Sequence, residues 1–151
     1  MTIPNAVDLA TIIGRIIALF RKELGLSQTE LAGRMKWDRS VLSRIEGGRN
    51  TANIDNIFEL EEQFMADHLI EGHGDLTRLT AEVVYEARRR GLRPVVGHVE
   101  KPEGEEPVEV PALDRIVARI LDDWLVAMRE HVVPEPDPEP KPARKKASRR
   151  M

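Results

Sequence analysis

The sequence contains no cysteine, which excludes both a disulfide framework and a thiolate zinc site. Aromatic residues make up only 4% of the chain, and runs of β-branched residues are few. Leu, Ile, Ala, Glu and Arg dominate the periodic stretches instead, and these residues as a set favour helices over strands. The composition therefore predicts an all-α protein rather than a sandwich or barrel.

Long apolar runs are missing as well. No run approaches the roughly 20 residues that a membrane-spanning helix needs. The apolar stretch 12–20 is interrupted by Gly14 and Arg15 and has no basic leader before it, which argues against a secretory signal. We therefore expect a soluble, cytoplasmic protein with no membrane partner.

The net charge of -3 conceals an uneven distribution of charge. Residues 1–50 hold eight basic and five acidic side chains, a net charge of +3, and residues 141–151 hold six basic side chains and no acidic one. Residues 51–140 carry a net charge of -12. Because basic faces attract phosphates, the two ends of the chain are the segments whose charge suits nucleic acid.

Residues 27–48, SQTELAGRMKWDRSVLSRIEGG, contain two short helical patterns separated by a few residues. Ser27 is followed by Glu30 at the spacing of a capping box, which predicts that a helix begins near residue 28. Asp38 is placed to cap the second helix in the same way. That helix has an apolar face and an opposite polar face; the apolar residues are Val41, Leu42 and Ile45.

The same stretch carries a family resemblance. The run Ser27-Gln28-x-x-Leu31-Ala32, then Trp37-Asp38-Arg39-Ser40-x-Leu42-Ser43-Arg44-Ile45-Glu46-x-Gly48, resembles the helix-turn-helix of lambda-type repressors and Cro-like regulators. The resemblance extends over about residues 9–66. It implies a DNA-binding domain of four to five helices in a sequence-specific transcriptional regulator, and it implies that this regulator is a repressor. It also implies a homodimer on a palindromic operator in double-stranded DNA.

The resemblance assigns roles to individual side chains. Bases are read by the second helix of the motif, and a guanidinium suits this because it can donate two hydrogen bonds to one guanine. The base-contacting candidates are Arg39, Ser40 and Arg44. The phosphate-contacting candidates are Gln28, by its matching position, and Ser43, Arg34, Lys36 and Arg49, by proximity.

Two further residues take structural roles. The resemblance implies an ion pair between Arg21 and Glu46 across the core, where loss of one partner would leave an uncompensated charge. Trp37 stands where the family usually has a small aliphatic residue, and we interpret it as a side chain that fills the core.

Helical patterns flank the motif on both sides. A wide apolar stripe precedes it and Gly25 ends that helix. After the motif, Asn53 is placed to cap a fourth helix, and residues 1–70 are predicted to form the DNA-binding domain. The apolar positions of the first helix are Ile12, Ile13, Ile16, Ile17, Phe20 and Leu24, and those of the fourth are Ile54, Ile57, Phe58, Leu60 and Phe64.

Residues 74–132 are predicted to form a helical extension, with a helix at 75–90 capped by Asp75 and a linker at 93–111 rich in proline and glutamate. Within that linker, 95–99 and 108–110 are candidates for a short hairpin. A second helix, at 112–132, has an apolar stripe that must be buried, either within the chain or against its own copy in a dimer. These dimerisation candidates are Leu113, Ile116, Val117, Ile120, Leu121, Trp124 and Met128.

The chain is predicted to end in a disordered segment, 133–151, that is proline-rich and then basic, with either sequence-independent DNA affinity or solubility as its role. No catalytic residue, metal site or cofactor is predicted, since His68 and His73 lack the spacing that places two ligands on one helix face. The competing hypothesis is an antitoxin or adaptor whose C-terminal half binds a partner protein.

Overall fold

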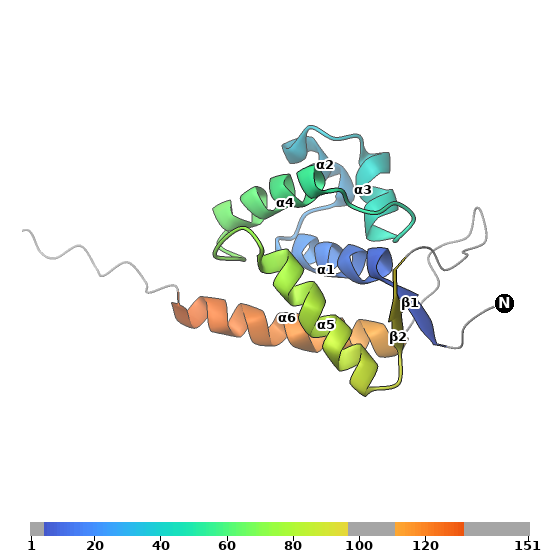
Figure 1. The fold of residues 1–151 in the computed structure, drawn as a ribbon. Coiled ribbons are helices and arrows are strands. Elements are labelled where there is room, and N and C mark those ends of the chain that lie inside the picture. The colour runs from blue at the N-terminus through green and yellow to red at the C-terminus, as the bar shows by residue number, and fades with distance from the viewer. Residues whose placement is uncertain (1–4, 97–110, 132–151) are drawn as a thin grey trace, which may run out of the picture.

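The structure, a computed structural model, describes residues 5–96 and 111–131. Helices dominate it, which confirms the predicted all-α class, and a two-stranded parallel pair is the exception in the described part. Figure 1 shows α2, α3 and α4 on one side of α1, and α5 and α6 on the other. The elements in chain order are β1 (Ala6–Asp8), α1 (Leu9–Glu23), α2 (Gln28–Met35), α3 (Arg39–Glu46), α4 (Ile54–Ala66), α5 (Asp75–Arg89), β2 (Arg93–Val95) and α6 (Pro111–His131).

Helix α1 is the central element of the core. The Asp8 carboxylate caps it by accepting a hydrogen bond from the backbone N–H of Thr11 at 2.8 Å. The helix ends before Gly25, whose φ of 71° is the left-handed conformation that glycine adopts without strain, as predicted. Because α1 packs against α3 as well as α5 and α6, its apolar residues are buried on more than one face.

Gly14 sets the distance between α1 and α3. A Cβ atom placed on Gly14 would lie 2.2 Å from the carbonyl oxygen of Ile45 and 2.8 Å from that of Glu46. Any side chain at this position would therefore collide with the last turn of α3. The absence of a side chain allows the two helices to approach closely, and this fixes where α3 sits on the domain.

The helices of the motif begin as predicted, with one exception. Ser27 and Glu30 form the capping box, and the backbone N–H of Ser27, followed by its hydroxyl, lowers the pKa of the Glu30 carboxyl. Asn53 caps α4 through a similar reciprocal pair with Asn56. The prediction for Asp38 is wrong in one respect: it is the N-cap residue of α3 by position, but within the described residues its side chain makes no capping hydrogen bond.

The start of α5 also differs from the prediction. Gly74, with a φ of 98°, is the N-cap residue, and the Asp75 carboxylate accepts hydrogen bonds from the backbone N–H groups of Glu71 and Gly72 instead. The cap is supplied from α4, where the buried Glu61 accepts bonds from the N–H groups of Gly74 and Leu76 at 2.8 and 3.1 Å. A carboxylate at a helix N-terminus is favoured by the helix dipole, so Glu61 ties α4 to α5.

The strand pair corrects the interpretation of the linker. Arg93–Val95 forms β2, which lies parallel to β1 with Val95 opposite Asp8. The predicted hairpin placed Val95 against 108–110, and residues 97–110 lie outside the described residues. The reason for the difference is tertiary: α5 returns the chain to the start of α1, where the backbone of residues 6–8 is available for pairing.

The apolar stripe of α6 is buried within the chain. It packs against α1 and α5, so of the two alternatives raised by the sequence the structure shows the intramolecular one. The side chains of this stripe therefore already have apolar neighbours within the chain, and a role in dimerisation stays a prediction. The fully or nearly buried residues are Leu113, Ile116, Val117, Leu121 and Met128, and the half-buried ones are Ile120 and Trp124.

One hydrophobic cluster runs from Val7 to Leu125 and includes residues of every helix. The segments predicted as a DNA-binding domain and a helical extension therefore share a core across α1. The predicted tail, 133–151, lies outside the described residues. In the described part, no helix is at once long and apolar enough to cross a membrane.

Candidate nucleic-acid interface

The helix-turn-helix geometry is produced by a tight turn between α2 and α3. Lys36 ends α2 in the left-handed conformation, with a φ of 58°, and the backbone N–H of Trp37 donates to the carbonyl of Ala32 at 2.9 Å. Trp37 is half-buried against the core, and its indole N–H donates to the Glu59 carboxylate at 3.1 Å. This bond to α4 gives Trp37 a polar anchor that the sequence did not indicate.

The outer face of α3 carries the three base-contacting candidates. Arg39, Ser40 and Arg44 are exposed, whereas Leu42 and Ile45 on the opposite face are buried at 0% and 2% exposure. Among the described residues, neither Arg39 nor Arg44 forms a hydrogen bond or an ion pair through its side chain. Both guanidinium groups therefore retain all their donors for an external acceptor.

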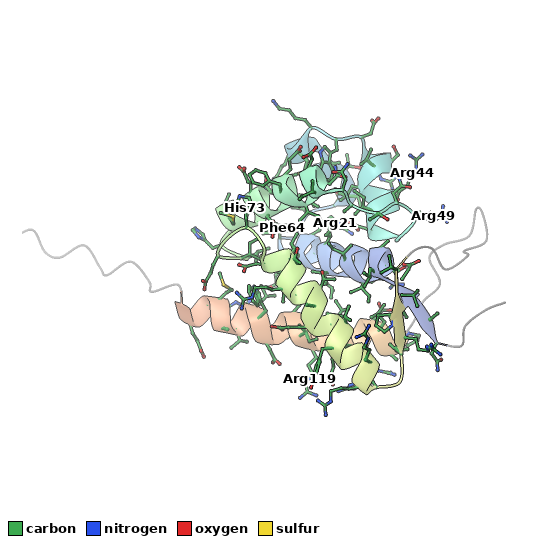
Figure 2. The ribbon with its side chains drawn as sticks, in the orientation of Figure 1. Arg21, Arg44, Arg49, Phe64, His73 and Arg119 are labelled. Carbon is green, nitrogen blue, oxygen red and sulfur yellow. The ribbon has the colours of Figure 1, made fainter. Side chains whose placement is uncertain are left out.

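The other candidates are distributed around α3. Arg34 on α2 is exposed and forms an ion pair with Asp67 at 3.5 Å, and Lys36 is exposed in the turn. Ser43 is half-buried, and Arg49 is exposed just after α3. Figure 2 shows Arg44 and Arg49 projecting from the same end of the molecule. Arg34, Lys36 and Arg49 are thus exposed basic residues around α3, the residue type that contacts a phosphate backbone.

Gln28 is placed differently from the other phosphate-contacting candidates. Its side chain is half-buried, and its amide nitrogen donates to Oε1 of Glu46 at 3.1 Å. This bond uses one N–H of the carboxamide and fixes the position of the side chain, while the second N–H and the carbonyl oxygen remain available for other hydrogen bonds. Gln28 thus connects the start of α2 to the end of α3, a contact that the sequence alone did not indicate.

Glu46 is the acceptor at the centre of this arrangement. Arg21 of α1 donates to it through Nε at 2.8 Å and through a terminal nitrogen at 2.9 Å, in the two-bond geometry that suits a guanidinium and a carboxylate. Arg21 also donates to the carbonyl of Leu26 at 2.8 Å. The structure thus joins the two residues that the resemblance pairs, and their side chains are 12% and 5% exposed.

The histidine-containing loop after α4 has a packing role. The His73 ring stacks on Phe58 with ring centroids 4.0 Å apart, and its Nδ1 lies 3.5 Å from Glu61 (His73 is labelled in Figure 2). Asp75 accepts bonds from the loop backbone. Among residues 5–96 and 111–131, His, Asp and Glu side chains form no group of three that could hold a metal ion.

Comparison with known proteins bears on the segment just described. Residues 17–64 match a protein-family model described as a helix-turn-helix, and this range covers all of α2 and α3, the second half of α1 from residue 17, and most of α4. Neither the curated proteins nor the solved structures gave a match. The family is a DNA-binding one, so the match supports a DNA-binding regulator. Residues 17–64 are therefore similar to a helix-turn-helix family, in agreement with the resemblance carried by residues 27–48.

Proposed function

We propose that this protein is a sequence-specific, DNA-binding transcriptional regulator that acts in the cytoplasm as a homodimer on a palindromic operator. The observation that carries the proposal is the exposed, cationic outer face of α3 within a segment that matches a helix-turn-helix family. Assignment as a repressor rests on the resemblance alone.

In this mechanism α3 lies in the major groove. Arg39 and Ser40, at the N-terminal end of α3, and Arg44, one turn further, meet base edges. An arginine that donates two bonds to O6 and N7 of guanine discriminates against another base by about 1 to 3 kcal/mol. Arg34, Lys36 and Arg49 contact phosphates and set the register of the domain on the duplex.

A single helix-turn-helix covers one half-site, so two copies are placed side by side about one helical turn apart. The buried stripe of α6 leaves the dimer contact to another surface. Ile54 and Phe58 lie one turn apart on α4 and are 81% and 50% exposed, an unusual exposure for large apolar residues of the helix-turn-helix segment. We assign the contact between copies to this pair.

Replacement of Arg44 by alanine tests the base-reading role. Operator fragments are first selected from random DNA with the purified protein, and the affinities for a selected fragment and for a random one are then measured at fixed salt. Arg44→Ala should reduce the affinity for the selected fragment by about 1 to 3 kcal/mol, because the lost bonds are base-specific. Affinity for random DNA should change little.

Arg34→Ala is the matched control, since Arg34 is an exposed arginine outside α3. Loss of a phosphate contact should weaken binding to both fragments equally and make the salt slope shallower by about one charge. Equal losses on both fragments for Arg44→Ala would overturn the base-reading role of Arg44.

Ile54→Glu tests the contact between copies. It should leave binding to a single half-site intact and abolish the dimer in sedimentation.

The basic residues at 141–151 are proposed to add sequence-independent affinity for DNA. Truncation before residue 141 should make the dependence of affinity on salt less steep without changing sequence preference. An unchanged salt slope would leave the segment without a role in DNA binding.

A further inference from the structure

A groove lies between α5 and α6 on the far side of the molecule from the recognition helix. It is lined by residues from Ala81 to Arg90 of α5 and from Arg115 to Asp123 of α6, and its volume is about 930 Å³. Figure 2 shows Arg119 of this groove and Arg44 of α3 at well-separated ends of the structure. A partner bound in this groove would leave the outer face of α3 accessible.

The two helices run in opposite directions along the groove. Arg78, near the start of α5, places its guanidinium 5.6 Å from the centre of the Trp124 ring near the end of α6. Further along α5, a hydrogen bond from Arg90 lowers the pKa of Glu86, and the charge of Arg119 on α6 acts in the same direction. The C-terminal end of α5 therefore faces the N-terminal half of α6.

Because the two helices are antiparallel, the basic and acidic side chains that line the groove lie toward opposite ends of it. The cations gather where α5 ends and α6 begins, and the carboxylates that have no ion-pair partner among the described residues lie toward the opposite end. The cationic end contains Arg89, Arg90 and Arg115, and the acidic end contains Glu82 and Asp123. Arg115 and Arg119 form no ion pair or hydrogen bond within the described residues, so their charges face solvent.

The middle of the groove is apolar. Tyr85 is 67% exposed, which is high for a large aromatic ring. Ile120 is half-buried beside it, and Ile116 forms part of the floor at 3% exposure. Tyrosine and arginine are the residue types that most often anchor protein–protein interfaces, and here they line the same groove.

The chemistry of the groove distinguishes among occupants. Carboxylates at Glu82, Glu86 and Asp123 repel phosphates, so a nucleic acid is disfavoured relative to a partner with charges of both signs. Small-molecule sites are mostly apolar and enclose their ligand, whereas this groove is open along two helices and lined by exposed charged side chains. An elongated groove between two helices suits a third helix that lies along it.

We propose that this groove docks an amphipathic helix of a partner protein, with carboxylates toward Arg89, Arg90, Arg115 and Arg119, an apolar residue on Tyr85, and cations toward Glu82 and Asp123. Complementary charges at the two ends fix the direction in which the helix binds. The proposal concerns a surface remote from α3 and does not depend on the DNA-binding function.

The test uses the full chain and a synthetic helical peptide as the probe. The peptide has Glu at i and i+4 spacing in its first half, Leu on the same face at its centre and Lys at i and i+4 in its second half, and it carries a fluorophore for anisotropy. The unmodified protein should bind it. The double variant Arg115→Glu, Arg119→Glu should bind it at least about tenfold more weakly, since each reversal replaces an attraction by a repulsion.

Arg88→Glu provides the matched control, because Arg88 is an exposed arginine of α5 outside the groove lining. It should leave peptide affinity within about twofold, and both variants should keep the urea midpoint of the parent, since all three arginines are exposed. Peptide with two Glu-bearing halves should bind less well than the Glu–Leu–Lys peptide, because its second half meets Glu82 and Asp123.

Three results would overturn the proposal. The first is absence of peptide binding at millimolar concentration. The second is evidence that the groove binds nucleic acid instead: the Arg115→Glu, Arg119→Glu variant would lose affinity for random DNA while its affinity for the peptide stayed unchanged. The third is self-association of the parent protein that this variant abolishes, which would make a second copy the occupant.

Discussion

The outer face of α3 and the groove between α5 and α6 are both rich in arginine, but their charges are arranged differently. Arg39 and Arg44 on α3 are exposed and have no acidic partner in the described part of the chain. In the groove, Arg89 and Arg90 contact Glu86, and further carboxylates lie nearby. Cations alone suit a polyanion, whereas both signs together suit a protein partner, so the carboxylates indicate the ligand class better than the number of arginines does.

The two surfaces nevertheless belong to one packed unit. Helix α1 contacts α3 on one side and α5 and α6 on the other, and a single hydrophobic cluster connects them. The shared core makes the stability of one surface depend on the other. A mutation in the core on either side of α1 therefore tests whether the two surfaces belong to one cooperatively folding domain or to two separate domains.

The largest effect is expected from a cavity in the α6 side of the core. Leu121 is 2% exposed, and Leu121→Ala should lower the free energy of unfolding by about 2 to 5 kcal/mol. Trp37 and Trp124 report on the two sides of α1, so urea unfolding is followed by fluorescence in Trp37→Phe and Trp124→Phe backgrounds. Both tryptophans should show the same shifted midpoint, because the core is continuous.

Val126→Ala is the control for this experiment, since Val126 is on the same helix and 52% exposed. It should change stability by less than about 0.5 kcal/mol. A Leu121→Ala protein in which only the Trp124 transition moved would show that α5 and α6 unfold separately from the helix-turn-helix.

A smaller effect is expected from the close approach of α1 to α3. Gly14→Ala places a methyl group against the carbonyls of Ile45 and Glu46 and should destabilise the fold by about 1 to 3 kcal/mol. Gly33 lies within α2 with no atom within 4 Å of the position of its absent Cβ, so Gly33→Ala should stabilise the protein by about 0.5 to 1 kcal/mol. Thermal denaturation of the two variants measures the difference in their stability. Similar Tm values for Gly14→Ala and Gly33→Ala would contradict the role of Gly14 in the close approach of α1 to α3.

The smallest effect is a dependence on pH at the start of α2. The pKa of Glu30 is lowered by its bonds to Ser27, so this contribution to stability is complete above the unfolded pKa of about 4.3 and is lost as the pH falls through the lower folded pKa. The difference in Tm between the parent and Glu30→Ala should shrink below that pH. Glu62→Ala, an exposed glutamate of α4, should show no such trend. If the difference in Tm between the parent and Glu30→Ala did not change with pH, the charged carboxylate of Glu30 would have no role in the cap.

Local signals predicted the helix-turn-helix well. The capping box at Ser27, the cap at Asn53 and the end of α1 before Gly25 are all confirmed, because each depends on residues within one turn of the helix terminus. The predictions for Asp38 and Asp75 as side-chain caps are wrong: Asp38 makes no capping hydrogen bond within the described residues, and Glu61 of α4 supplies the cap of α5. A cap donated by another helix leaves no trace in local spacing.

By itself, the sequence determined the class of the fold, the start of α2 and α4, and the placement of Arg39, Ser40 and Arg44 on the outer face of α3, since helical periodicity fixes which residues share a face. Only the tertiary structure decided that α6 packs on α1 and α5, that β2 pairs with β1, and that an arginine-lined groove forms beside α5. The physical reason is that an apolar stripe requires burial without specifying its partner, whereas a groove exists only after two helices have been placed together.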